Sequence, residues 1–426
     1  MKKVVIIGSG LAGLSAAYYI LKKSDKKPEV LIVEKEKYIG GRAHTAYIDG
    51  KYIDLGGFMI FPFYKALRRL ISELGLDSSM KRLASDTEWY QLKPNSSLTK
   101  GEDIPILKLI PFSVLRHIAL PILEGKVDFY EPDLKLFDRE TVHQFYKEHL
   151  PDSFKKEESL HNELFEAYTY TPIAHVPMTL CMSVAKELVF HGMFTRCEHL
   201  EGGTSLITSA LEKEIENMGG VIRTEAAVKK VKNKKIHLVS GEEITSDEII
   251  FASFPPQSFL KENFNHWQKA SHTHYQTVVV EMEKDTNINN EPWFVLYCSM
   301  PENRRSPHAA SIGQCSSFSN LSGKYLITNI SIRKDDTQTH SADELEEICR
   351  RDFKQYFPDN AVHKIFTAHD WKHTMPIVDT DLIEEFRLKQ GENDVYFVGD
   401  YTGFPCMDIA VYSGRRVAEK ITLKNA

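Results

Sequence analysis

Three glycines near the start of the chain, Gly8, Gly10 and Gly13, have the G-x-G-x-x-G spacing that lets a backbone turn approach phosphate groups. They follow the β-branched run 4–7 and precede the apolar run 11–21, so we expect a buried strand, a tight turn and a buried helix. In such a unit the first glycine makes the turn, the second admits a diphosphate, and the third lets the helix pack on the strand. The free N–H groups at the start of the helix then favour negative charge.

An acidic residue, Glu34, ends the next expected strand, 30–33, about twenty residues after the glycines. A carboxylate at this position binds the hydroxyl pair of a ribose and repels a 2′-phosphate. Lys2 and Lys3 before an apolar run also resemble the charged and apolar regions of a secretory leader. The ordered series of strand, glycines, helix, strand and acid favours a dinucleotide site over a leader.

Two further glycine-rich turns indicate which dinucleotide is bound. A nicotinamide domain has no need of the Gly-Gly-Arg turn at 40–42, whereas a flavoprotein can use its glycines for close backbone approach and Arg42 for a phosphate or the isoalloxazine edge. The alternative is a surface turn with a solvated arginine. Residues 53–59 then supply Asp54 and Gly57 at the end of another expected strand.

The C-terminal part of the chain repeats this pattern. We expect a short strand at 395–398, a turn at Gly399 and Asp400, and a helix from about Met407 to about Ile421. Asp400 can accept hydrogen bonds from ribityl hydroxyls. The start of the helix can stabilise negative charge on the N1–C2=O edge of a flavin, so we expect one cofactor to be held by both ends of the chain.

As a set, G-x-G-x-x-G, the acid, G-G-R, D-x-G-G and a C-terminal G-D followed by M-[E/D]-x-A-x-x-S-G resemble the flavin-containing amine oxidoreductases. This family includes monoamine and polyamine oxidases, protoporphyrinogen oxidases and carotenoid desaturases, and the chain resembles the carotenoid (phytoene) desaturase-like members most. The resemblance implies an α/β fold, a Rossmann-like FAD-binding domain with an inserted α+β substrate domain. One departure is Ile409, where the family usually has glycine. The residues expected to bind FAD are Gly8, Gly10, Leu11, Ala12, Gly13, Glu34, Lys35, Gly41, Arg42, Gly57, Phe58, Met59, Val228, Gly399, Asp400, Met407 and Asp408.

The segment 199–231 also fits the family. It contains a helix expected to end at Gly219 and Gly220, followed by strands, and by resemblance the backbone at Val228 touches the adenine. We therefore expect a discontinuous FAD-binding domain and a substrate domain made of two inserts, the first mostly helical and the second containing strands. The FAD-binding domain comprises 1–85, 199–255 and 385–426, and the substrate domain comprises 86–198 and 256–384.

The interior of the chain bears on the substrate class. Segments 61–76 and 164–192 resemble the carotenoid desaturases, although apolar residues at helical spacing are also what a core requires. Amine oxidases of the family commonly have an aromatic residue where this chain has Cys406, and a small thiol cannot wall an amine against the flavin. Tyr401 or Phe404 can replace that wall. The expected substrate contacts are Trp371, Tyr401, Phe404 and Cys406.

The apolar stretch 104–123 is suited to a membrane interface that admits a lipid-soluble substrate, or to an internal layer of the substrate domain. The net charge of -6 gives no reason to expect nucleic acid. The 6 cysteines form no C-x-x-C pair, which predicts reduced thiols in a cytoplasmic protein. His369 and His373 have the spacing of metal ligands but lack a third ligand, so we expect no metal.

These observations predict an FAD-dependent oxidoreductase that moves hydride from a C–H bond of a small apolar substrate, isoprenoid in type, to flavin N5. Two alternatives stay open. One is an FAD-dependent amine oxidase, and the other is a catalytically inactive flavin-binding protein whose role is to bind a partner. The sequence identifies neither a general acid or base nor the electron acceptor.

Overall fold

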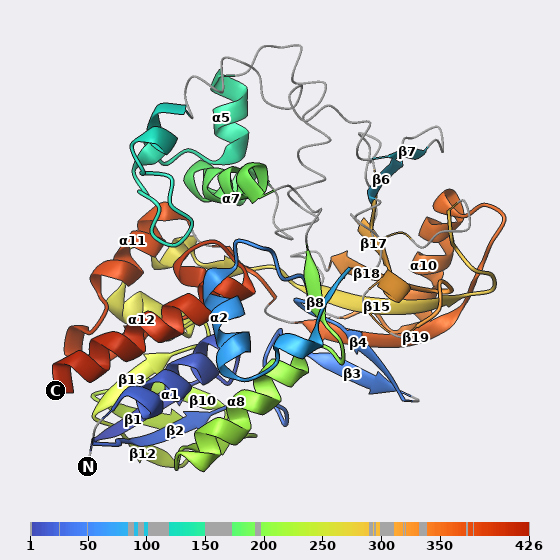
Figure 1. The fold of residues 1–426 in the computed structure, drawn as a ribbon. Coiled ribbons are helices and arrows are strands. Elements are labelled where there is room, and N and C mark those ends of the chain that lie inside the picture. The colour runs from blue at the N-terminus through green and yellow to red at the C-terminus, as the bar shows by residue number, and fades with distance from the viewer. Residues whose placement is uncertain are drawn as a thin grey trace.

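The computed structural model describes the chain except for residues 1, 25, 49, 84–88, 93–97, 101–118, 150–172, 192–196, 289–292, 294, 299–310, 318, 320, 332–338, 372–373, 378 and 426. Figure 1 shows a parallel sheet at lower left, a larger sheet at right, and a helical region at upper left.

The parallel sheet has five strands, and β1 lies at its centre between β13 and β2. Val4, Val5 and Ile6 in β1 are fully buried. A strand that is buried on both faces has no polar side, which explains its unbroken β-branched run. In spatial order the strands are β21 (Val395–Phe397), β13 (Glu248–Phe251), β1 (Lys3–Ile7), β2 (Glu29–Val33) and β9 (Val221–Arg223).

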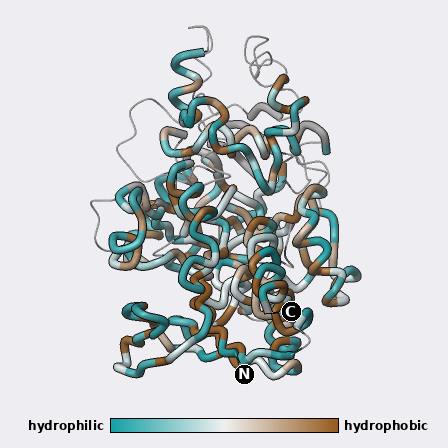
Figure 2. Tube along the Cα trace, turned by 90° about the vertical axis from the view of Figure 1, so that its left-hand side faces the viewer, coloured by the Kyte–Doolittle hydropathy of each residue, from teal (hydrophilic) through white to brown (hydrophobic). Residues whose placement is uncertain are grey.

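Helix α1 (Leu11–Lys23) packs between α8 (Ser205–Asn217) and α12 (Met407–Asn425). The two helices α1 and α12 approach closely because α12 carries Gly414, where an added Cβ would lie 2.5 Å from the carbonyl oxygen of Ala12. Figure 2 shows the hydrophobic stretch that begins at the N terminus running into the molecule, where it forms part of the largest core cluster. All three helices confirm the sequence-based expectation.

The larger sheet has seven strands and two different faces. Val278 and Val280 in β15 pack with Phe353 of α10 (Ala342–Tyr356), whereas Val279 belongs to the core cluster of the parallel sheet. This alternation is what a strand buried on both sides requires. The strands in order are β19 (Val362–Trp371), β15 (Tyr275–Met282), β18 (Tyr325–Ser331), β17 (Ser311–Gln314), β16 (Val295–Cys298), β6 (Trp89–Leu92) and β7 (Leu98–Lys100).

The remaining described elements are helices and short sheets that belong to neither of these two sheets. A helical region at upper left in Figure 1 has its own small core around Val142, Phe145 and Cys181. The two-stranded sheets are β3 (Thr45–Ile48) with β4 (Lys51–Asp54), β5 (Met80–Arg82) with β8 (Glu198–Leu200), and β14 (Ser271–His272) with β20 (Pro376–Ile377). The three-stranded sheet is β10 (Val228–Lys232), β11 (Lys235–Leu238) and β12 (Glu243–Thr245). The helices are α2 (Lys65–Glu73), α5 (Val142–His149), α7 (Met178–His191), α9 (Gln257–Asn263) and α11 (Thr380–Leu388).

The fold class is the expected one, an α/β Rossmann-like unit with a second, mixed part. Every strand of the parallel sheet comes from one of the three segments 1–85, 199–255 and 385–426, and every strand of the seven-stranded sheet comes from 86–198 or 256–384. The first insert contributes strands β6 and β7 in addition to the expected helices. The domain boundaries themselves stay a prediction.

The apolar stretch 104–123 lies largely outside the described residues, which begin again at residue 119. In the part that is described, Leu120 is 60% exposed and Leu123 is 83% exposed. No helix in the described part of the chain is long and apolar enough to cross a membrane. Peripheral membrane contact by this stretch and a cytoplasmic location stay predictions.

Gly13 provides a test of this fold. We predict that Gly13→Ala destabilises the protein by about 1–3 kcal/mol, the usual cost of overpacking, because the added Cβ would lie 2.1 Å from the carbonyl oxygen of Gly8. Denaturant unfolding of the flavin-free protein measures the change. Gly10→Ala is the matched control, since a Cβ at Gly10 meets no atom within 4 Å. Equal stability of the two variants would contradict the packing described here.

Candidate functional site

The first glycine turn has the geometry of a phosphate site. Gly10 immediately precedes α1, and among the described residues no side chain caps the start of this helix. A Cβ added at Gly10 would meet nothing within 4 Å, so the space beside this backbone is open. Gly8 has a φ of +106°, which only glycine adopts easily. Uncapped N–H groups facing open space fit a diphosphate, so the turn fits the cofactor expected from the sequence.

Glu34 is buried at the end of β2 and faces this turn. Its carboxylate accepts hydrogen bonds from the backbone N–H and the hydroxyl of Ser9, both at 2.8 Å, and from the N–H of Glu36 at 2.9 Å. A carboxylate has about four acceptor positions, so one remains for a ribose hydroxyl. The sequence did not indicate Ser9 as the partner that orients Glu34. Lys35, which follows it, is exposed and pairs with Glu36 at 3.5 Å.

The turn at 40–42 lies directly against the first turn. Gly40 donates a hydrogen bond from its N–H to the carbonyl of Ser9 at 2.9 Å. An added Cβ at Gly41 would lie 3.2 Å from the Cα of Gly10. Two turns that are about thirty residues apart in the sequence therefore form one continuous backbone surface.

Arg42 connects this surface to the C-terminal motif. Its guanidinium donates to the Asp400 carboxylate at 2.7 Å and contacts the Met375 sulfur at 3.0 Å. Asp400 is buried, and the neighbouring Gly399 donates its N–H to the Ser413 hydroxyl at 2.9 Å. The arginine that the sequence assigned to phosphate or flavin thus holds the Asp400 loop in place.

The backbone of Arg42 also meets the third motif. Its carbonyl accepts the N–H of Gly57 at 3.0 Å, and a Cβ added at Gly57 would lie 3.2 Å from the Cγ of Met407 at the start of α12. The motifs at 8–13, 40–42, 53–59 and 399–408 are therefore in contact in one series. Their contacts with FAD stay a prediction, but the structure brings together the segments that the prediction requires.

Asp54, in the third motif, is hydrogen-bonded to residues of two other segments. Its Oδ1 accepts the hydroxyl of Thr45 at 2.5 Å and both the N–H and the hydroxyl of Thr204 at 2.9 Å. Its Oδ2 is buried and has no partner among the described residues. Burial raises the pKa of Asp54 to about 6, and the hydrogen bonds from Thr45 and Thr204 oppose this shift. Asp54 therefore joins β3, β4 and the start of α8.

Asp408 is hydrogen-bonded to α2 and to Tyr130. Its two oxygens accept the N–H of Leu67 at 2.6 Å and the hydroxyl of Tyr130 at 2.7 Å, and the residue is fully buried. Burial raises the pKa of Asp408 to about 6. A carboxylate near the N terminus of one helix can accept hydrogen bonds from the free N–H groups of a second helix. Here Asp408, in α12, accepts the N–H of Leu67 in the first turn of α2. The structure thus favours a positioning role over the direct FAD contact expected from the sequence.

Two of the expected substrate contacts are core residues. Tyr401 is 2% exposed and Phe404 is 1% exposed, so neither ring offers surface to a substrate in this structure. The Tyr401 hydroxyl donates to the carbonyl of Phe251 at 2.7 Å. This differs from the expectation that these rings could form a substrate wall, because the turn before α12 directs both inward.

The other two expected contacts differ in exposure. Trp371 is 7% exposed and donates its indole N–H to the Thr277 hydroxyl at 2.8 Å. Cys406 is half-buried beside the first turn of α12, where its sulfur lies 3.5 Å from the N–H of Ile409. Burial raises the pKa of the Cys406 thiol, so the thiol is neutral. The remaining expected residues Phe58, Met59 and Val228 are half-buried and pack against the main core.

Sequence reasoning missed a group of aromatic and imidazole rings beside Arg42. The rings of four residues lie in contact one after another, with their planes tilted, and we call these residues the ring cluster: Tyr38, His44, His369 and Trp371. One sequence feature could have indicated this cluster. His44 follows Arg42 by two residues and Trp371 follows His369 by two, the spacing that puts side chains on the same face of an extended segment. The spacing of His369 and His373 is that of metal ligands, but His373 lies outside the described residues.

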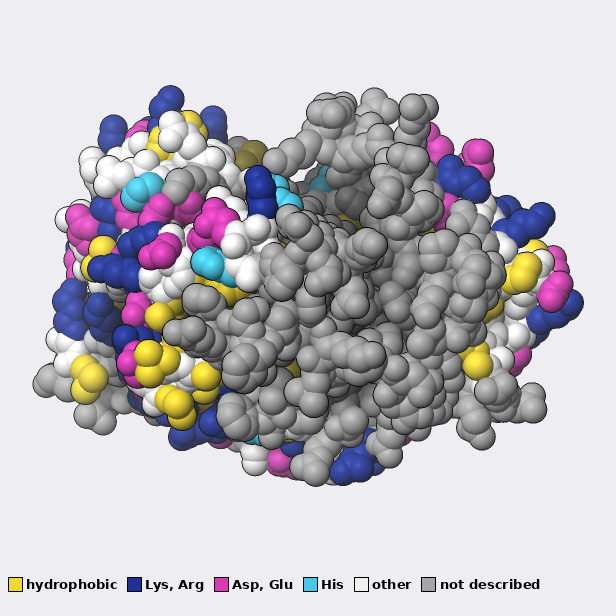
Figure 3. Space-filling view, turned by 90° about the horizontal axis from the view of Figure 1, so that it is seen from above, with side chains coloured by type: hydrophobic (Ala, Val, Ile, Leu, Met, Phe, Trp, Pro, Cys, Tyr) yellow, Lys and Arg dark blue, Asp and Glu magenta, His cyan; other side chains and the backbone are white. Residues whose placement is uncertain are grey.

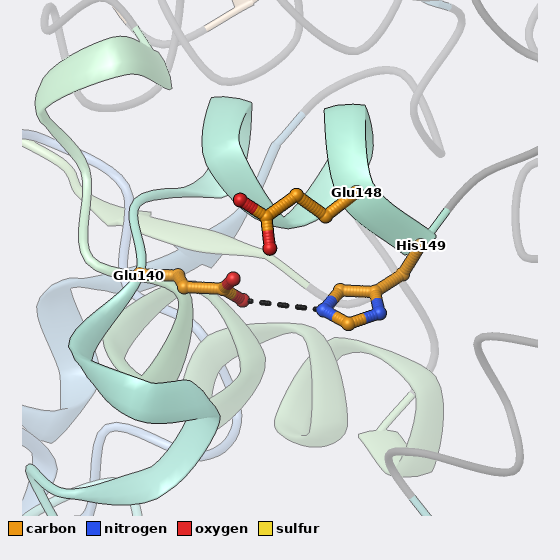
Figure 4. A group of neighbouring side chains, drawn as sticks. All are labelled: Glu140, Glu148 and His149. Carbon is orange, nitrogen blue, oxygen red and sulfur yellow. Dashed lines mark ion pairs between the residues drawn. The ribbon is translucent and has the colours of Figure 1, made fainter.

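One group of side chains has the composition of a metal site. Figure 4 shows Glu140, Glu148 and His149 pointing toward one another near the end of α5, with Nε2 of His149 3.5 Å from Glu140. Glu148 and His149 are exposed, and such groups are common without an ion. These three residues are far in sequence from the glycine motifs.

On the face seen in Figure 3, acidic and basic side chains are interspersed over the described surface.

Comparison with known proteins bears on this site. The family model described as flavin containing amine oxidoreductase matches residues 11–422. Prenylcysteine oxidase 1 from Rattus norvegicus is 39% identical over 77 residues, which are 18% of this chain and 15% of that protein. Coproporphyrinogen III oxidase from Bacillus subtilis (strain 168) is 29% identical over 160 residues, 35% of this chain and 33% of that protein. These matches span at most a third of the length of each relative.

The fold has solved counterparts over its whole length. The structure described as a CLA-producing fatty acid isomerase from P. acnes has a TM-score of 0.75 and 16% identity, and the alignment covers 98% of each chain. Identity at this level establishes similarity of fold alone.

Gly10 tests the phosphate site. We predict that Gly10→Val leaves the unfolding midpoint of the flavin-free protein unchanged but abolishes flavin retention, because the side chain fills the open space beside the helix start. Flavin absorbance after gel filtration measures retention. A variant that retains full flavin absorbance would place the phosphates elsewhere.

Asp54 gives a pH-dependent prediction. Its pKa rises from 3.8 to about 6 on folding, so between these pH values the folded state holds a proton that the unfolded state has lost. Its contribution to stability therefore falls as pH rises through this window, by up to about 3 kcal/mol. We predict that Asp54→Asn, which keeps the Oδ1 acceptor, gains stability relative to the parent from pH 4 to pH 6 by about this amount. Denaturant unfolding across that range would disprove the assignment if the difference between the two proteins were constant.

Proposed function

Because the chain belongs to the flavin containing amine oxidoreductase family, its class is that of the FAD-dependent oxidoreductases, and we propose that it removes hydride from a C–H bond of a small apolar substrate. Bound FAD would accept the hydride at N5. The protein's own residues bind the cofactor at Gly10, Glu34 and Gly41 and orient it through Arg42 and Asp400. The dipole of α12 adds stabilisation of negative charge at its start.

The observation that supports this proposal is the contact series from Gly10 through Gly41, Arg42 and Gly57 to Met407. These residues come from both ends of the chain, and Gly10 among them borders open space. A continuous glycine-lined surface that begins at the uncapped start of α1 and ends at the start of α12 suits an extended dinucleotide.

The substrate class is inferred from the residue before α12 and from the relatives. Cys406 is small, and the nearby Tyr401 and Phe404 are buried, so the described residues next to Met407 provide no exposed aromatic wall of the kind expected for an amine. Prenylcysteine oxidase 1 has an apolar isoprenoid group in its name, whereas L-amino-acid oxidase from Pseudechis australis, 33% identical over 94 residues, is named for an amine. The small Cys406 and the prenyl relative support an apolar, isoprenoid-type substrate, and the amine oxidase stays the alternative.

An anaerobic screen tests the proposal. The purified yellow protein is mixed with prenyl compounds, fatty acids and amines, and loss of flavin absorbance reports hydride transfer. We expect reduction by an apolar compound and none by simple amines. Rapid reduction by amines would establish the amine oxidase alternative, and a protein that binds FAD but is reduced by neither class would favour the partner-binding alternative.

Cys406 gives a more specific prediction. We expect Cys406→Tyr to keep the flavin spectrum but to lose at least about tenfold in reduction rate by the apolar substrate, because a bulky ring would take the space that the small thiol leaves beside Met407. The matched control is Cys406→Ser. Since the thiol is neutral, we also expect acid denaturation of the parent to release all the flavin. Flavin that stays attached to the chain, or a Tyr variant with parental rate, would contradict this account.

A further inference from the structure

The ring cluster joins the cofactor turn to the seven-stranded sheet. Ring centroids are 4.5 Å apart between Tyr38 and His44, 5.1 Å apart between His44 and His369, and 4.0 Å apart between His369 and Trp371. The Tyr38 hydroxyl lies 3.4 Å from Nε2 of His369. Two imidazoles, with ring planes tilted by 38°, thus lie next to each other between the turn at 38–44 and the end of β19.

Backbone pairing fixes where His44 lies relative to the expected flavin site. The carbonyl of Arg42 accepts the N–H of Gly57 at 3.0 Å, and the carbonyl of His44 accepts the N–H of Leu55 at 2.9 Å. His44 is therefore one residue pair along the ladder from Arg42, a step of about 7 Å.

Contacts with one segment put the side chains of Arg42 and His44 side by side. Arg42 contacts the Met375 sulfur, and the His44 ring lies 5.1 Å from that of His369 and 6.2 Å from that of Trp371, so both side chains meet the segment 369–375. Arg42 also pairs with Asp400 of the cofactor series. The ring cluster therefore borders the cofactor series on the side of the seven-stranded sheet.

Both imidazoles are neutral near neutral pH. Burial and, to a lesser extent, the neighbouring His369 together lower the pKa of His44 to about 4. Burial also lowers the pKa of His369, while Asp370 and Glu36 oppose the shift. Arg42 provides a nearby positive charge, and burial raises the pKa of Tyr38 to about 12, so Tyr38 stays neutral.

The ring of His44 is available to accept a proton. Within the described ranges no hydrogen bond reaches its nitrogens, and neither nitrogen is among the fully enclosed unpaired atoms. Hydride transfer adds negative charge to a flavin, and an added negative charge nearby favours protonation of an imidazole. Neutral imidazoles next to a site that gains negative charge are suited to proton uptake.

We propose that His44 and His369 form an acid–base pair that takes up one proton whenever the flavin is reduced by two electrons. This inference rests on the proposed function. With FAD bound, one C–H bond of the substrate would break and its electron pair would leave with hydrogen as hydride, which is the chemistry that FAD supplies. A second C–H bond would break, its electron pair would form the new C=C bond, and its proton would pass to an imidazole. The substrate would thus lose two electrons and two protons, one proton leaving within the hydride and the other held by the histidine pair.

Spectroelectrochemistry of the purified holoprotein tests the pair without a substrate. The midpoint potential of the bound flavin is measured from pH 5 to pH 8. Uptake of two protons per two electrons gives a slope of about 59 mV per pH unit, and uptake of one proton gives about 30 mV. We expect the larger slope over part of this range in the parent. We expect the smaller slope throughout in His44→Phe and His369→Phe, which keep a ring in the stack.

His363→Phe is the matched control, because His363 is an exposed histidine on the same strand. It should retain the parental slope. If a Phe variant does not fold, the corresponding Gln variant takes its place. A parent with the one-proton slope at every pH, or Phe and Gln variants that retain the two-proton slope, would overturn the acid–base pair. A protein that binds no FAD would instead refute the proposed function.

Discussion

The ion pair between Arg42 and Asp400 is the interaction on which the proposed site depends. It connects a turn near the N terminus to a turn 358 residues later, and its carboxylate is buried. A buried charge without its partner is costly, typically about 3–5 kcal/mol, whereas the pair itself adds little stability relative to apolar residues. The pair therefore contributes mainly by specifying one arrangement of the two turns. With Arg42 in place, Asp400, Met375 and the start of α12 have fixed positions around the glycine turns.

Close backbone approach is the second constraint, and it explains the glycines that line this surface. An added Cβ at Gly56 would lie 1.9 Å from the carbonyl oxygen of Arg42, so no other residue fits there without moving the chain. Gly10 is different, because its surroundings are open. Gly13 is of the first kind, since an added Cβ there would lie 2.1 Å from the carbonyl oxygen of Gly8, whereas Gly10 leaves room for the proposed ligand. The first motif therefore contains both a glycine that packing requires and a glycine that packing does not require.

The sequence predicted the elements of the cofactor site better than the direction of its side chains. Strands β1, β2 and β21 and helices α1, α8 and α12 lie where hydrophobic periodicity and the glycines placed them. Asp408 and Tyr401 were assigned to ligand contact because they belong to the C-terminal motif, yet one caps α2 and the other is in the core. A local motif identifies the turn, but the partners of a side chain come from elements distant in the sequence. The pairing of His44 with His369 is of this kind, since it depends on how β19 meets the turn at 38–44.

The two faces of the seven-stranded sheet have different neighbours. One face packs against α10, and the other joins the core of the parallel sheet near the ring cluster. A substrate lying against that second face would meet residues of both parts. The most direct test is a crystal structure of the protein with FAD. The account predicts one dinucleotide extending from the open space at Gly10, past Gly41 and Asp400, to the start of α12 at Met407. Electron density for FAD at any other place, or a diphosphate distant from Gly10, would contradict it.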